Sequence, residues 1–317
     1  MKQHRDLIIF GLCITLLPLV VHNPYYISIL VFIGIYSIAA TGLNLLMGYA
    51  GQISLGHGAF YALGAYTSGI LTLRYQVPFF VAFPLAIATA AVLAYLIGVP
   101  CLRLKGHYLA MATLAAGEIV YIILNAAVAV TGGPSGIAGI PSLRIGSWEL
   151  ESDVHHYSLV WVVFFVLLIL SRNIIASRIG RALRSLHDGE IAAASFGVPV
   201  ANVKIKVFVL SAVYAAIAGV LYAHTVTFIS PQTAELMFSI QLITMVVIGG
   251  MGHLWGGVVG AAIMTLVPEL LSAFHDYEMV IYGGILLLMV MFLPGGLVRG
   301  VQRLVRRSCL LLTGKHS

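Results

Sequence analysis

The chain of 317 residues is 60% apolar and only 9% charged, with a mean hydropathy of +1.02. Soluble domains average about a quarter charged residues, so this composition excludes a water-soluble protein. Because about 20 apolar residues cross one bilayer, about ten crossings leave no loop long enough for a second globular domain. The sequence therefore predicts an all-α polytopic membrane protein with a single transmembrane domain over residues 1–317.

Ten apolar runs follow one another along the chain and predict about ten transmembrane helices, near residues 7–22, 27–47, 55–73, 78–100, 108–130, 157–171, 204–226, 236–254, 257–275 and 279–297. The first run is interpreted as a retained span, because no small-x-small cleavage site precedes Asn23-Pro24. Gly-rich turns at 48–58 and 249–257 interrupt the pattern, and a re-entrant segment is the alternative at either one.

The basic residues predict which side of the membrane each loop faces. With the N-terminus inside, only Arg74 and Arg144 of the 17 Lys and Arg residues fall on the outer side. Both termini are therefore expected in the cytoplasm. The net charge of +6 is explained by these loops, so it does not indicate a nucleic-acid partner.

Two segments lie outside the predicted spans. The external loop, at about 131–156, opens with turn-forming glycines. The cytoplasmic loop, at about 172–204, contains Asp188 as a candidate N-cap, Glu190 in the first turn and Gly197 as a stop signal. This pattern predicts a short helix on the inner face of the membrane.

The chain lacks the motifs of an enzyme. It has no G-x-x-x-x-G-K-[ST], H-E-x-x-H or G-x-S-x-G sequence. Cys13, Cys101 and Cys309 form no disulfide or zinc pattern, and His155-His156 has no third ligand. We expect no catalytic residue, no metal and no cofactor bound by this chain.

Small residues recur at four-residue steps in the predicted spans. Gly252, Gly256 and Gly260 form one such series, and Gly64 with Ser68 forms another. This spacing lets a neighbouring helix approach closely in lipid. Helix packing is the favoured interpretation, and contact with a substrate is the alternative.

The stretch 48–58 predicts an interrupted helix, since four glycines and several polar side chains separate two apolar runs. Irregular backbone at membrane depth persists only where protein or a water-filled path satisfies it. Gln52, Ser54 and His57 are therefore candidates to line a translocation path.

One acidic residue, Glu118, lies near the middle of a predicted span, and Asn125 shares its helical face. Ionisable residues within the bilayer are costly and usually functional. Both residues are path candidates, while an interhelical hydrogen bond is an equally weighted alternative for Glu118.

Four stretches resemble the integral-membrane subunits of branched-chain amino-acid ABC importers, namely residues 51–66, 178–184, 248–261 and 293–297. The second stretch is followed by further matching positions up to Ser211-Ala212. Length and the extended external loop resemble the M-type permease of this family more than the H-type.

The resemblance implies a bacterial inner-membrane importer that works by alternating access. This chain would pair with an H-type permease, two cytoplasmic ATPases would hydrolyse ATP, and a periplasmic binding protein would deliver an amino acid. Glu190, Ala193 and Gly197 match the family's E-A-A-x-x-x-G core, which implies ATPase coupling by these residues together with Arg181 and Asp188.

Other functions remain open at this point. Relatives implied to carry urea or short amides are the main alternative, since substrate choice would rest largely on the binding protein. An ion-coupled secondary transporter is a second alternative, with Glu118 as its proton or cation site. A lipid-modifying enzyme and a membrane scaffold are further alternatives that fewer features favour.

Overall fold

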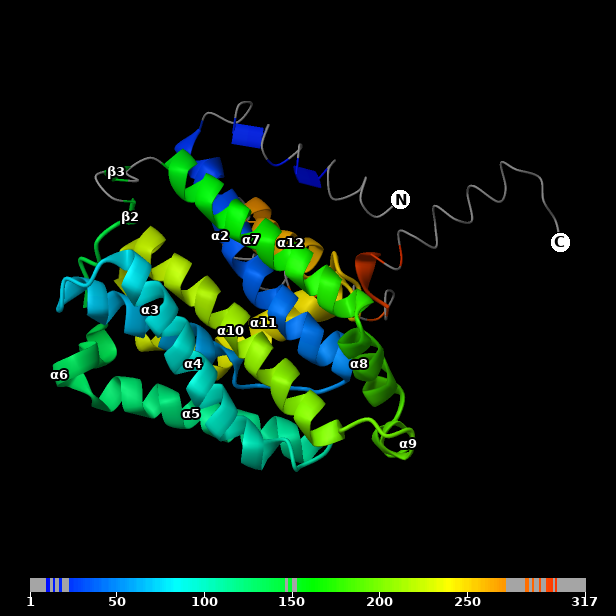
Figure 1. Ribbon diagram of the computed structural model, residues 1–317. Coiled ribbons are helices and arrows are strands. Elements are labelled where there is room, and N and C mark those ends of the chain that lie inside the picture. Colours follow the sequence, from blue (N-terminus) through cyan, green and yellow to red (C-terminus); the bar gives the residue numbers. More distant parts are fainter. Residues whose placement is uncertain are drawn as a thin grey trace, which may run out of the picture.

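The computed structural model describes residues 23–145, 148–149 and 153–271, together with the isolated positions 10, 11, 14, 17, 18, 283, 284, 287, 291, 295–298 and 300. Most of the predicted first and last spans, and the sidedness of both termini, lie outside the described residues. Within the described part, the protein is a bundle of long helices (Figure 1).

The eight internal apolar runs predicted from the sequence each coincide with a helix. These helices are α2 (Pro24–Asn44), α3 (His57–Leu73), α4 (Phe79–Cys101), α5 (His107–Ala126), α7 (Asp153–Ala176), α10 (Val200–Val226), α11 (Leu236–Gly249) and α12 (Gly256–Leu271). In the described part of the chain, five helices are long and apolar enough to cross a membrane: α2 with the π-helix η1 (Leu45–Tyr49) that continues it, α4, α5, α7 and α10. The chain is thus a multi-pass, all-α membrane protein.

Short elements connect the long helices. They are α6 (Val128–Thr131), η2 (Gly133–Ser135), η3 (Pro231–Ala234) and two helices between α7 and α10, α8 (Arg178–Asp188) and α9 (Glu190–Ser195). Two antiparallel strand pairs complete them: β1 (Ile137–Ala138) with β4 (Phe228–Ile229), and β2 (Arg144–Ile145) with β3 (Trp148–Glu149). The predicted external loop therefore holds turns, the β2–β3 pair and strand β1, which pairs with β4 after α10.

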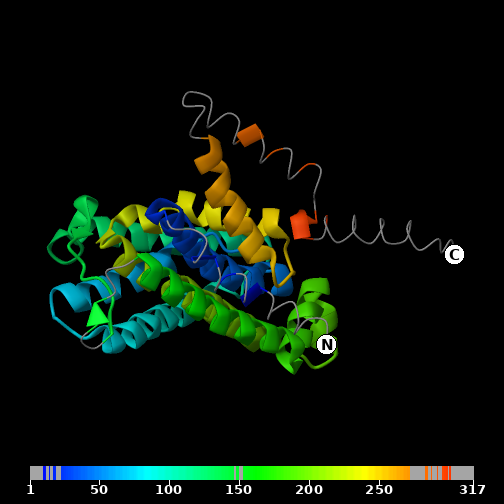
Figure 2. The same cartoon turned by 90° about the horizontal axis from the view of Figure 1, so that it is seen from above.

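The bundle has two different ends. We call the end with α8 and α9 the basic end, since most exposed cations of the described loops gather there (Arg103, Lys105, Arg178, Arg181 and Arg184), whereas Arg74 is exposed at the opposite end. The opposite end carries the strand pairs. Figure 2, seen from above, shows that α12 crosses the other helices steeply, while α8 and α9 stay at the basic end.

Helices α2 and α10 form the centre of the bundle, and small residues allow the close packing around them. On α4, a stripe of buried small residues recurs every four positions (Ala82, Ala86, Ala90, Ala94 and Gly98). Where α3 meets α10, a Cβ atom on Gly64 would lie 2.3 Å from the Ala216 carbonyl oxygen. Contacts this close are the means by which helices associate in lipid.

The predicted glycine series on one helix is wrong at its first member. Gly252 lies in the turn between α11 and α12, with a φ of +69° that only glycine adopts easily, and its N–H donates to Asn44 Oδ1 at 2.9 Å. Gly256 and Gly260 do lie on α12, where added Cβ atoms would collide with the carbonyl oxygens of Gly250 and Met245. Helix α11 stops at Gly249 because the following glycines leave helical geometry.

Candidate functional site

The helix interruption predicted at 48–58 is present. After η1 ends, Gly51 has a φ of +68° and the chain runs without helical structure to Gly56. Six extended residues reach at most about 20 Å, so this segment alone cannot cross the hydrocarbon core of about 30 Å. In Figure 1 it is the blue stretch without coils that leads from the basic end to the start of α3. We call residues 51–56 the inner segment.

His57 fixes the depth at which α3 begins. Its Nε2 hydrogen-bonds with Ser211 Oγ at 2.7 Å, and its Nδ1 with Ser54 Oγ at 2.9 Å. Ser211 lies near the middle of the 27-residue α10, so α3 starts deep inside the bundle. All three side chains are buried, and their polar atoms are satisfied within the protein, as irregular backbone at this depth requires.

A second interruption faces the first. Residues 227–235, which we call the outer segment, return from the opposite end through β4 and η3 to the start of α11. The N–H of Gly58 donates to Ser239 Oγ at 2.9 Å, so α11 begins at the depth of the first turn of α3. Helix α11 has 14 residues, about 21 Å, and is too short to cross a bilayer alone.

Sequence reasoning missed the outer segment, because residues 227–235 resemble an ordinary loop between two spans. The available signal was the polar run Ser230–Thr233 immediately before a short apolar helix. Ser211, Thr113 and Ser239 were also missed as partners of the inner segment and α3. Each is a single hydroxyl in an apolar helix, and only packing shows what it bonds.

The other two path candidates lie on α5. Gly117 packs on Gly56, where an added Cβ would come 3.1 Å from the Gly56 Cα, so its neighbour Glu118 is half-buried beside the inner segment. Asn125 lies two turns further toward the opposite end and donates to the Tyr121 carbonyl on its own helix. The structure thus places the backbone at Glu118 next to the inner segment and leaves Asn125 apart.

The predicted cytoplasmic loop forms a helical hairpin rather than one short helix. Asp188 ends α8, and Gly189 stands at the N-cap of α9 without a side-chain bond, so the predicted Asp188 cap is wrong. Ala193 is buried, whereas Gly197 is exposed with a φ of +79°. The hairpin turns at Gly189, whose extended backbone (φ 170°, ψ 120°) interrupts the helical geometry between α8 and α9.

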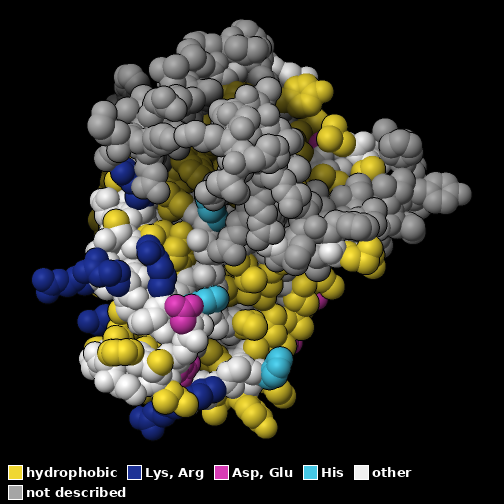
Figure 3. Space-filling view, turned by 90° about the vertical axis from the view of Figure 1, so that its right-hand side faces the viewer, with side chains coloured by type: hydrophobic (Ala, Val, Ile, Leu, Met, Phe, Trp, Pro, Cys, Tyr) yellow, Lys and Arg dark blue, Asp and Glu magenta, His cyan; other side chains and the backbone are white. Residues whose placement is uncertain are grey.

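The outer face of this hairpin is basic and apolar. Figure 3 shows Lys and Arg side chains gathered over the basic end beside exposed hydrophobic groups. Arg181 is exposed on α8, while Ile191 on α9 and Phe196 just after it are 80% and 88% exposed. Two large apolar side chains with this exposure next to cations are typical of a surface that a protein partner covers.

Glu190 points the other way, into the bundle. Its carboxylate forms an ion pair with Lys204 of α10 and lies 3.9 Å from Lys105 Nζ. Gln52 Nε2 donates to the same carboxylate at 3.4 Å, which joins the hairpin to the inner segment. Lys204 is only 2% exposed, so this carboxylate is the counter-charge of a buried cation.

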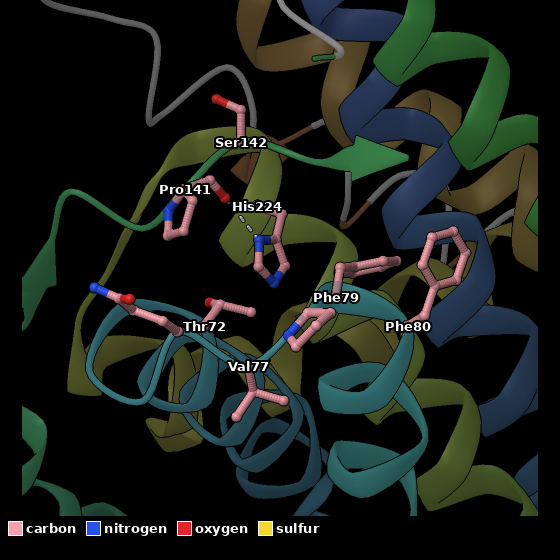
Figure 4. A pocket seen from close by; sticks show the side chains of 9 residues that line it. Thr72, Val77, Phe79, Phe80, Pro141, Ser142 and His224 are labelled. Carbon is pink, nitrogen blue, oxygen red and sulfur yellow. Dashed lines mark hydrogen bonds between the residues drawn. The ribbon is translucent and has the colours of Figure 1, made fainter. Parts of the chain in front are cut away.

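Cavities open at both ends of this arrangement. At the basic end, a cavity of about 260 Å³ lies between the start of the inner segment and the hairpin, with Gln52 and Glu190 in its wall. At the opposite end, a cavity of about 520 Å³ is lined by Thr72, Phe79 and His224 (Figure 4). His224 Nδ1 donates to the Pro141 carbonyl and Nε2 accepts from Ser68 Oγ, so this buried side chain holds the cavity wall.

Comparisons with known proteins identify the family of this chain. Residues 25–291 match the family model described as branched-chain amino acid transport system / permease component. The chain belongs to this family. It is 35% identical to the high-affinity branched-chain amino acid transport system permease protein LivM of Salmonella typhimurium, over 83% of this chain and 68% of that protein.

Two further relatives place the chain within the permease family. It is 34% identical to LivM of Escherichia coli, over 90% of this chain and 74% of that protein. It is 27% identical to LivH of the same organism, over 83% of this chain and 91% of that protein. No solved structure matches the chain. The resemblance to the M-type permease is therefore confirmed over most of the sequence.

Proposed function

We propose that this chain is the membrane-spanning subunit of an ATP-driven importer for branched-chain amino acids. The relatives support the transport role, since LivM and LivH are both named as permease proteins of a high-affinity branched-chain amino acid transport system. In an ATP-driven importer, a membrane chain without a G-x-x-x-x-G-K-[ST] sequence relies on another subunit for ATP hydrolysis. The observation that carries the proposal is the α8–α9 hairpin, whose exposed Ile191 and Phe196 offer that motor a docking surface.

In the proposed assembly, two cytoplasmic ATPases contact the hairpin and an H-type permease packs beside the bundle. A binding protein delivers the amino acid at the opposite end, where the His224 cavity opens. This places the basic end in the cytoplasm, in agreement with the positive-inside rule, in a bacterial inner membrane. It also requires an even span count of about ten, with both termini in the cytoplasm.

The two interrupted helices suit alternating access. A helix cannot deform along its axis without breaking its backbone hydrogen bonds. The inner and outer segments lack a continuous series of these bonds and are positioned by a few side-chain hydrogen bonds, such as that of His57 with Ser211. Such joints can exist in two arrangements whose populations the motor and the binding protein shift. Glu118 on α5, next to the inner segment, is the proposed contact for the substrate, whereas Gln52, Ser54 and His57 hold the segment in place.

The docking proposal is tested by the double variant Ile191→Asp/Phe196→Asp in the complete transporter purified from membranes. Two carboxylates at apolar contacts should release the ATPases and abolish uptake of labelled leucine, because an unpaired charge is costly to bury in an interface. Phe196→Leu and Asn202→Asp, which keep the apolar character and the surface polarity, are the matched controls. Undiminished retention of the ATPases by the double variant would refute docking on the hairpin.

The substrate class is tested separately in reconstituted vesicles. Leucine, isoleucine and valine should compete with labelled leucine in the presence of ATP and the binding protein, whereas urea should not. ATP-independent uptake driven by an ion gradient would instead favour a secondary transporter, and loss of that uptake in Glu118→Gln would identify its cation site.

A further inference from the structure

The orientation of Glu190 separates it from the exposed residues of the hairpin. Its side chain is 22% exposed, whereas Ile191 and Phe196 are 80% and 88% exposed. Both of its carboxylate oxygens face cations of the same chain, Lys204 and Lys105. Glu190 and Ile191 line one cavity at the basic end together with Lys105 and Lys204, so the carboxylate is held by cations of this chain beside the docking surface.

Lys204 ties Glu190 to α10. A cation that is 98% buried needs its counter-charge, since an unpaired buried charge is far costlier than an unpaired neutral group. The pair thus holds the first residue of α9 against the second turn of α10. Helix α9 cannot move away without either carrying α10 with it or exposing Lys204.

Gln52 ties Glu190 to the inner segment. The Gln52 side chain is buried, and its Nε2 donates to Glu190 Oε1 and also lies 3.3 Å from the Ala50 carbonyl. Its Oε1 has no partner within the described residues. The amide can therefore accept as well as donate when the group opposite changes.

These contacts form a closed circuit. From Glu190, one branch passes through Gln52 and the inner segment to His57, and the other passes through Lys204 along α10 to Ser211. The two branches meet at the His57–Ser211 hydrogen bond. A displacement of α9 thus reaches the start of α3 by two routes of packed, hydrogen-bonded groups.

We infer that Glu190 transmits the motor's movement to the inner segment through Gln52 and Lys204. Gln52 and Lys204 are positioning residues for the transport cycle. This inference rests on the proposed function, because it presumes ATPases on the hairpin. It assigns to Ile191 and Phe196 the docking and to Glu190 the coupling.

The test uses the complete transporter in proteoliposomes with its binding protein. Three variants are compared with the wild type: Gln52→Leu, Lys204→Met and the charge exchange Glu190→Lys/Lys204→Glu. Lys206→Met, two residues along α10 and exposed, is the matched control. The measured quantities are retention of the ATPases and the amount of leucine transported per ATP hydrolysed.

Gln52→Leu and Lys204→Met should retain the ATPases and lose about tenfold in leucine transported per ATP, within the usual range of coupling between two sites. The charge exchange should recover most of this loss, because the ion pair is restored and the free Gln52 Oε1 can accept from a lysine. A residue that merely supports the fold would lower yield without changing transport per ATP.

Two results would overturn the inference. If the charge exchange releases the ATPases, Glu190 serves to dock the motor and not to transmit its movement. If Gln52→Leu transports as much leucine per ATP as the wild type, the inner segment does not depend on this link. Gln52→Leu removes no charge, so it tests the link even where Lys204→Met fails to reach the membrane. Failure of the wild-type chain to retain any ATPase would instead refute the proposed function.

Discussion

Gly58 donates its backbone N–H to Ser239 Oγ at 2.9 Å, and this bond joins the first turns of two helices that both begin inside the bundle. Helix α3 leaves this point toward the opposite end, and α11 leaves it toward the basic end. The first N–H groups of a helix have no partner within that helix, so each start needs a donor or acceptor from elsewhere. Ser239 supplies the acceptor for the Gly58 N–H at a helix start that lies inside the bundle, away from water.

Removal of the Ser211 hydroxyl should destabilise the protein. Ser211→Ala leaves a buried ring nitrogen of His57 without its partner, which costs about 1–3 kcal/mol. The expected result is a lower unfolding temperature in detergent. Ser158→Ala is the control, since that hydroxyl only bonds one turn back along α7. Equal unfolding temperatures for both variants would show that the His57 bond does not hold α3 in place.

Replacing Glu190 and replacing Lys204 should lower the unfolding free energy by different amounts. Glu190→Gln strands a cation that is 2% exposed and should cost about 3–5 kcal/mol. Lys204→Met leaves a carboxylate that is 22% exposed, with Lys105 nearby, and should cost about 1 kcal/mol or less. Thermal unfolding of both single variants and of the double variant measures this. The double variant should be more stable than Glu190→Gln alone, and the reverse order would contradict burial of the charge.

A methyl group at Gly64 should separate α3 from α10. An added Cβ would lie 2.3 Å from the Ala216 carbonyl oxygen, and backbone atoms cannot move aside cheaply. Gly64→Ala should therefore cost about 1–3 kcal/mol in unfolding free energy. Gly189→Ala is the comparison, because its Cβ would meet only an ordinary contact at 3.9 Å and its φ of 170° is extended backbone. Tolerance of Gly64→Ala would mean that the two helices are less closely packed.

Thr227 marks a strained point at the start of the outer segment. A β-branched residue rarely adopts a φ of +59°, whereas asparagine tolerates this region. Thr227→Asn should raise the unfolding free energy by about 1 kcal/mol. The check is the unfolding temperature compared with Thr225→Asn, two residues earlier and within α10. A decrease for Thr227→Asn would place the strain elsewhere.

The membrane class and the helix positions followed from the sequence, because a run of about 20 apolar residues has no other stable environment than lipid. The same pattern could not distinguish a full crossing from a half crossing. Residues 55–73 and 236–254 have the hydropathy of spans, yet α3 and α11 begin near mid-depth. Their starts are set by tertiary hydrogen bonds from Ser211 and Ser239, which hydropathy does not record.

The sequence by itself determined the family, the Gly-rich interruption at 48–58 and the hairpin region with Glu190, since these depend on local composition and spacing. Only the tertiary structure decided that Glu190 faces Lys204 and Gln52, that Gly252 lies in a turn, and that the outer segment descends to meet Gly58. The physical reason is that direction and depth are set by partners distant in sequence. A buried cation on α10 decides where a carboxylate on α9 points.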